Sequence, residues 1–132
     1  KSKTMSTLAV GTIKSVSSAA PVFQNTSGTE KGQLAKAWVL YNGNTDTVLD
    51  SFNVSSITRH SAGQYTVNFS TSFSSTNYCA TPTTPFFNTG NDVWVVQGLQ
   101  DNRLTGSCRF WTNQATSTFD SSNFGVVFFG DN

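Results

Sequence analysis

Apolar and polar residues alternate along the chain from residue 36 onward. The alternation is clearest between residues 65 and 70, where polar residues separate Tyr65, Val67 and Phe69. A period of two is typical of a strand that packs one face on a core and exposes the other to water. Turn-forming residues interrupt the pattern at roughly ten-residue spacing, which is typical of β-sandwiches and barrels.

This pattern predicts a series of strands joined by tight turns. We expect strands over 37–42, 47–53, 54–59, 65–70 and 78–84, and shorter ones at 93–96, 108–111 and 126–129. Asn42-Gly43-Asn44 predicts a tight turn, because Asn and Gly tolerate positive φ. Pro82 and Pro85 lack the N–H that a ladder needs, so the strand beside them is expected at a sheet edge.

Three segments near the end of the chain carry bulky apolar residues at successive positions. They are Val93–Val96, Cys108–Trp111 and Val126–Phe129. A strand that is apolar on both faces is covered on both sides, and monomers rarely expose a large apolar patch. We therefore expect a homo-oligomer in which copies of the chain bury the second face. The candidate interface residues are Val93, Trp94, Phe110, Trp111, Val127 and Phe129.

Length and composition agree with one small all-β domain. The 132 residues suffice for one core, and only 11% of them are charged, whereas Phe alone occurs 11 times. Residues 1–35 are rich in Ser, Thr, Ala and Lys and too poor in apolar residues to form a core. We expect residues 1–35 to form an extended N-terminal arm or attachment segment, and the alternation at Leu8 and Val10 allows one short strand there. An antiparallel β-sandwich domain is expected over 36–132.

The charge pattern argues against several classes of partner. The net charge is +1, and the lysines of the first third are thinly spread. A nucleic-acid binder usually carries a basic stripe, and a membrane span needs roughly 20 apolar residues. We therefore expect neither a nucleic-acid nor a membrane partner.

Few residues are arranged for catalysis. His60, the one histidine, precedes a Ser-Ala-Gly turn without a GxSxG motif, so we expect an exposed turn residue. A glycosidase needs two carboxylates in a cleft, but six of the seven carboxylates fall in predicted turns or chain ends. We expect no enzyme activity, no catalytic residues, no cofactor and no metal site.

The loop that begins at Pro85 is the candidate ligand-binding segment. Aromatic rings beside amides and a carboxylate suit sugar recognition. The candidate residues are Phe86, Phe87, Asn88, Asn91 and Asp92. In the alternative interpretation, the two phenylalanines pack into the subunit contact.

Cys79 and Cys108 are the two cysteines. They form either a disulfide between strands or two free thiols in a protein made in a reducing cytoplasm, and their spacing suggests no metal site. We favour free thiols.

Several motifs resemble a known module. They are Lys36–Val39 (KAWV), Ser51–Thr58 (SFNVSSIT) and Gly63–Phe69 (GQYTVNF, containing YTVNF). With them, residues 36–78 resemble a module found near the C-terminal end of tail fibres of tailed phages. Phe124–Gly130 is similar to the final strand of that module. Met5–Ile13 resembles the opening of short virion proteins in marine phages, especially cyanophages.

The resemblance implies a virion structural protein. It suggests a tail fibre or similar appendage, made in the host cytoplasm, that forms homotrimers and contributes to host attachment. Its partners would be other virion proteins, reached through the N-terminal arm, and a host surface glycan. A capsid head fibre or decoration protein is one alternative, and a soluble carbohydrate-binding lectin is another. The family supplies no catalytic residues to carry over.

Overall fold

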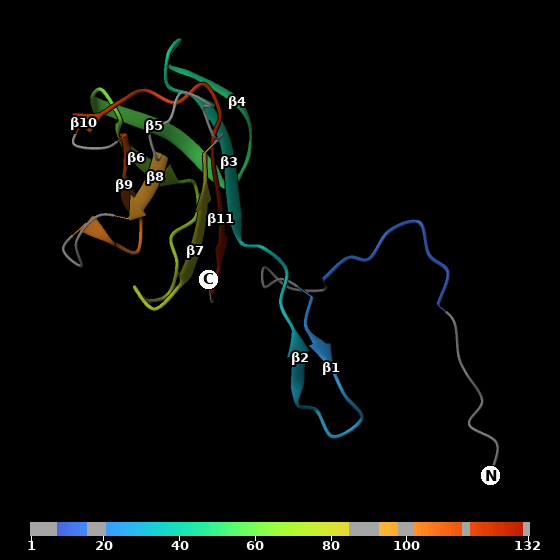
Figure 1. Ribbon diagram of the computed structural model, residues 1–132. Coiled ribbons are helices and arrows are strands. Elements are labelled where there is room, and N and C mark those ends of the chain that lie inside the picture. Colours follow the sequence, from blue (N-terminus) through green and yellow to red (C-terminus); the bar gives the residue numbers. More distant parts are fainter. Residues whose placement is uncertain (1–7, 16–20, 85–92, 98–101, 115–116, 131–132) are drawn as a thin grey trace. The chain divides into compact units, whose positions relative to one another are not determined.

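A computed structural model describes residues 8–15, 21–84, 93–97, 102–114 and 117–130 of the chain (Figure 1). The regular elements within these residues are strands. The chain divides into two compact units, Lys1–Gln33 and Leu34–Asn132. Each unit is described by itself.

The first unit contains a short antiparallel hairpin that the sequence pattern did not predict. It pairs β1 (Phe23–Gln24) with β2 (Glu30–Gly32). Asn25 shapes its turn, because its Oδ1 accepts hydrogen bonds from the backbone N–H groups of Ser27 (3.1 Å) and Thr29 (2.9 Å). Such local bonds form without a core.

The strand expected near Leu8 and Val10 is wrong. Residues 8–15 form no strand, and the Leu8 and Val10 side chains are 79% and 52% exposed. Alternation alone does not make a strand where no second strand offers a ladder.

The second unit consists of two packed antiparallel sheets (Figure 1). The first sheet runs in the order β4 (Thr47–Phe52), β3 (Ala37–Asn42), β11 (Phe124–Phe129) and β7 (Cys79–Thr83). The second sheet runs from β5 (Val54–Ser61) through β6 (Gln64–Phe69) to β9 (Ser107–Gln114). Two further strands, β8 (Val93–Gln97) and β10 (Ser117–Thr118), pair with opposite edges of β9. The expected antiparallel all-β fold is confirmed.

Most strand predictions agree with the structure to within a few residues. The strand over 37–42 has the expected bounds, whereas β5 continues to Ser61 and β6 begins at Gln64. The strand β7 lies at the edge of the first sheet, as its proline predicts, and Pro82 lies opposite Val126 of β11.

The core lies between the two sheets and is built from alternate residues of β3, β6, β9 and β11. The buried apolar residues are Ala37, Val39, Tyr41, Tyr65, Val67, Phe69, Phe73, Tyr78, Cys108, Phe110, Phe124, Val126 and Phe128. Aromatic rings meet edge to face across it; Phe69 and Phe128 have centroids 4.9 Å apart at 85°. The alternation predicted for Tyr65, Val67 and Phe69 is confirmed.

Asn53 links the two sheets between β4 and β5. It adopts φ 53°, a left-handed conformation that Asn accepts more readily than most residues. Its Nδ2 donates to the carbonyls of Lys36 (3.0 Å) and Thr71 (3.1 Å), and its Oδ1 accepts from the Thr71 N–H (2.7 Å). One side chain therefore stabilises the crossing and the segments beside it.

Candidate functional site

The outer face of the first sheet carries apolar side chains in register across its four strands. Phe52 of β4 lies opposite Trp38 of β3, which lies opposite Val127 of β11, which lies opposite Thr81 of β7. We call this surface the first outer face and define it by Trp38, Leu40, Phe52, Cys79, Val127 and Phe129.

The first outer face is open to solvent and poor in charge. Phe52 is 55% exposed, Phe129 39% and Leu40 37%. The four strands of this sheet contain a single charged residue, Asp50. Exposed apolar side chains that adjoin one another on a face of this kind commonly mark a contact with another protein.

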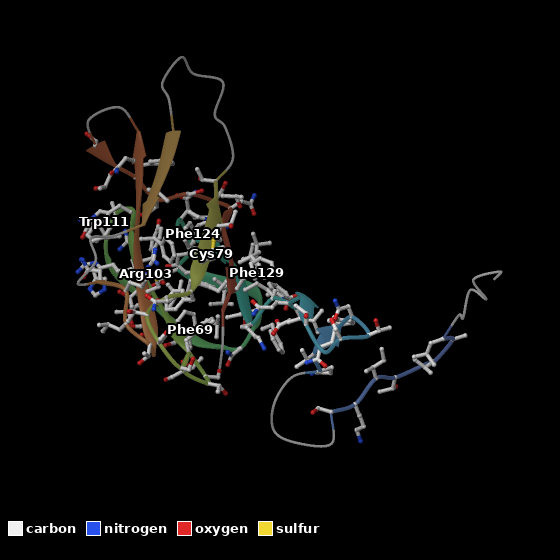
Figure 2. All side chains as sticks on the ribbon, turned by 90° about the horizontal axis from the view of Figure 1, so that it is seen from below. Phe69, Cys79, Arg103, Trp111, Phe124 and Phe129 are labelled. Atoms are coloured by element: carbon white, nitrogen blue, oxygen red, sulfur yellow. The ribbon has the colours of Figure 1, made fainter. Side chains whose placement is uncertain are left out.

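Trp111 lies on the opposite side of the sandwich. Figure 2 shows Trp111 and Phe129 on the two sides of the unit, with Phe69 and Phe124 between them. The guanidinium carbon of Arg109 lies 4.9 Å from the centroid of a Trp111 ring. We call this surface the second outer face and define it by Thr58, Gln64, Thr66, Asn68, Arg109 and Trp111.

The structure corrects one predicted interface residue. Phe110 has no exposed surface, because it packs against Phe124 and Phe128 in the core. Successive residues of β9 alternate between core and surface, so Phe110 points inward while Arg109 and Trp111 lie outward. The inner face of β9 is therefore apolar at Cys108 and Phe110, whereas its outer face is mixed, with Arg109 beside Trp111.

The remaining candidate residues divide between described and undescribed parts. Val127 and Phe129 lie on the first outer face. Val93 and Trp94 belong to β8, where their backbones pair with Gln114 and Asn113. The candidate ligand loop, with Phe86, Phe87, Asn88, Asn91 and Asp92, lies outside the described residues.

Alternation of the short run 37–41 could have identified two members of the first outer face that the sequence interpretation missed. Trp38 and Leu40 stand between the buried residues Ala37, Val39 and Tyr41, so that strand is apolar on both faces. Phe52 follows from them only through the register of β4 against β3.

A carboxylate stabilises one end of the sandwich. Asp120 Oδ1 accepts hydrogen bonds from the Tyr65 hydroxyl (2.7 Å) and the Gly63 N–H (3.0 Å), and Asp120 Oδ2 accepts one from Arg59 Nη2 (2.5 Å). These donors belong to β5, β6 and the turn between them. Asp120 therefore ties the segment that precedes β11 to the second sheet.

Gly63 makes this approach possible. It has φ 66°, and a Cβ there would lie 2.5 Å from the Thr112 carbonyl oxygen and 2.6 Å from that of Phe119. A side chain would therefore push the turn away from the segment that carries Asp120.

The environment shifts the ionisation of both acidic groups in this cluster. Burial by itself would raise the pKa of Asp120, but hydrogen bonds from Arg59, Gly63 and Tyr65 outweigh burial and lower it. Burial, and then the hydrogen bond to Asp120, raise the pKa of Tyr65 to about 12. Near neutral pH, Asp120 is therefore ionised and Tyr65 is neutral. This pair of states favours the hydrogen bond between them and a structural role for the cluster.

His60 is exposed, as expected, and lies in β5 rather than in a turn. Its Nε2 is 2.9 Å from Thr66 Oγ1. Cys79 and Cys108 are free thiols: Cys79 is exposed on the first outer face, and Cys108 is buried in the core. Cys79 faces away from the core on the first sheet, whereas Cys108 faces into the core from the second sheet. The two thiols cannot form a disulfide unless a strand is rebuilt.

Within the described residues, no group of three or more His, Cys, Asp or Glu side chains could hold a metal ion. Over the same parts of the chain, no helix is long and apolar enough to cross a membrane.

No protein-family model matches the chain, and no curated protein or solved structure is detectably similar to it.

Proposed function

We propose that this chain is a structural subunit of a virion, in a tail fibre or similar appendage, and that copies of it assemble through the first outer face. The observation that carries the assembly role is the row of Phe52, Trp38 and Val127 across three adjacent strands that are nearly free of charge. Phe52 is exposed, and Trp38 and Val127 are half-buried. The virion role is supported by the resemblance of residues 36–78 to the tail-fibre module.

A structural role also fits the kind of polar cluster that the chain contains. Asp120 accepts its hydrogen bonds from groups of its own unit, among them the Arg59 guanidinium and the Tyr65 hydroxyl. Its low pKa makes it a poor proton donor near neutral pH. We therefore propose a role in assembly and attachment rather than catalysis, and three copies per assembly, by analogy with tail fibres.

Light scattering on two matched variants tests the assembly. Phe52→Glu places a charge on the first outer face, and Leu104→Glu places one on a side chain of nearly equal exposure (55% and 54%) that lies elsewhere. We expect an oligomer for the wild type and for Leu104→Glu, and a folded monomer for Phe52→Glu. A wild-type protein that stays monomeric at micromolar concentration would refute the proposal.

Immunogold labelling of virus particles tests the location. Antibody against the chain is expected to label the tail. Label on the head would favour a head fibre or decoration protein, and unlabelled particles would favour the lectin.

A further inference from the structure

The second outer face differs in chemistry from the first. It combines one cation and one indole with hydroxyl and amide side chains on three adjacent strands. Register places Thr58 opposite Thr66, and Thr66 opposite Arg109. Hydroxyl and amide side chains beside an aromatic ring suit the recognition of a sugar.

Arg109 is held in place but only partly satisfied. Its Nη2 donates to Gln64 Oε1 (2.8 Å), and its guanidinium lies over Trp111. A guanidinium carries five N–H donors, yet Gln64 supplies the one acceptor found for it among the described residues, and Arg109 Nε is covered without any acceptor. The covered Nε is out of a ligand's reach, so an anion would have to bind at the outer guanidinium nitrogens, for which Gln64 is the one acceptor found among the described residues.

The neighbouring amides retain free hydrogen-bonding groups. Asn68 Nδ2 donates to Ser56 Oγ and Thr58 Oγ1, each at 3.0 Å, which fixes its orientation. Within the described residues, Asn68 Oδ1 and Gln64 Nε2 have no hydrogen-bond partner. Gln64 therefore keeps a donor beside the guanidinium, and Asn68 keeps an acceptor two positions along β6 from Thr66, the residue opposite Arg109.

The charge around Arg109 favours an acidic ligand. The strands β5, β6, β8 and β9 contain no Asp or Glu. Arg59, the other arginine of β5, β6 and β9, already pairs with Asp120. Arg109 is thus a cation of this sheet that has no carboxylate partner among the described residues.

We propose that the second outer face binds an acidic sugar. Its carboxylate would accept hydrogen bonds from Arg109 and Gln64, its hydroxyl groups would meet Asn68 and Thr66, and its ring would pack beside Trp111. The inference deepens the attachment part of the proposed function, and it places recognition on the sheet rather than in the loop at residues 86–92.

Titration of short oligosaccharides by calorimetry tests the site. The probes are an oligogalacturonate, a neutral dextran oligomer and a sulfated dextran oligomer of equal length. We expect binding of the oligogalacturonate alone, and at least a tenfold loss of affinity in Arg109→Gln and in Trp111→Ala. Lys36→Gln is the matched control, because it removes the same charge outside this face.

Each other outcome overturns the inference. Equal losses in Arg109→Gln and Lys36→Gln would show attraction by net charge alone, and equal binding of the sulfated oligomer would show a general polyanion surface. Absence of binding by a wild type whose thermal unfolding is normal would also refute it. None of these results changes the oligomer measurement with Phe52→Glu, so failure here is distinguishable from failure of the assembly proposal.

Discussion

At the scale of single residues, Asp120 connects distant parts of the second unit. Its carboxylate accepts hydrogen bonds from a turn, a strand and an arginine that are more than fifty positions away in sequence. These are long-range contacts, whereas an Asp in a turn usually bonds to its own neighbouring backbone. The local sequence pattern places Asp120 in a turn but does not indicate which residues it contacts. The partners become visible only when the sheets are assembled.

Asp120→Asn is expected to lower the free energy of unfolding by about 1–3 kcal/mol near neutral pH, because the amide turns a donor toward Arg59 where an acceptor is required. The effect should depend on pH. An Asp whose pKa in the folded protein lies below its ordinary 3.8 stabilises the fold above about pH 4 and loses this contribution as the pH falls through the lowered value. Urea unfolding at several pH values measures both.

The control for this substitution is Asp50→Asn, which changes an exposed carboxylate and should cost less than about 0.5 kcal/mol. Two results would contradict this role of Asp120: an Asp120→Asn variant as stable as the wild type, or one whose stability falls in acid as steeply as that of the wild type.

At the scale of elements, the six residues of β11 supply both the core and the first outer face. Phe128 has no exposed surface and meets Phe69, Phe110 and Tyr78, whereas its neighbour Phe129 is 39% exposed on the first outer face. The same residue type at adjacent positions therefore serves the core once and the surface once.

Phe128→Ala should cost about 3–5 kcal/mol of stability, as expected for a large ring removed from a packed core. Phe129→Ala should cost roughly 1 kcal/mol or less in the monomer and should weaken assembly instead. Chemical denaturation and light scattering of the two proteins separate these effects. Similar stability losses in both would mean that the strand does not present two distinct faces.

Most strands and their buried faces could be predicted from the sequence. In a strand with one face in water, apolar and polar residues alternate with a period of two. The bounds of β3 and the inward set of β6 follow from that period. Phe110 was misplaced because four successive residues were assigned to both faces without assigning each one. The partners of Asp120 and the pairing of Phe52 with Trp38 could not be predicted, because both depend on which strands become neighbours.

At the scale of the whole second unit, the sandwich has two outer faces of opposite character. One is apolar and carries the thiol of Cys79 beside Phe129, and the other carries Arg109 and Trp111 among polar groups. If copies of the chain associate through the apolar face, as proposed, the other face stays free for a ligand.

The Cys79 thiol provides a test of this division. In dilute native protein, a thiol reagent is expected to modify Cys79 quickly and Cys108 only after unfolding, because Cys108 is buried. At concentrations where the protein assembles, Cys79 should be protected in the wild type and remain reactive in Phe52→Glu. Labelling followed by mass spectrometry gives both rates.

Reactivity of Cys79 that is independent of protein concentration would place the subunit contact elsewhere. If neither cysteine reacted even after unfolding, the two would be joined by a disulfide and the strands that carry them would need to be repositioned.

The all-apolar sequence of β11 also affects how the strand finds its place during folding. In a strand with one solvent-exposed face, a one-residue shift of the pairing register would bury polar side chains and is therefore unfavourable. In β11 such a slip would bury Gly125, Val127 and Phe129 instead, which are apolar as well. Correct alignment must then come from shape: Phe128 fills a ring-lined site, and Gly125 leaves room for Thr83, whose Oγ1 would lie 2.8 Å from any Cβ at that position.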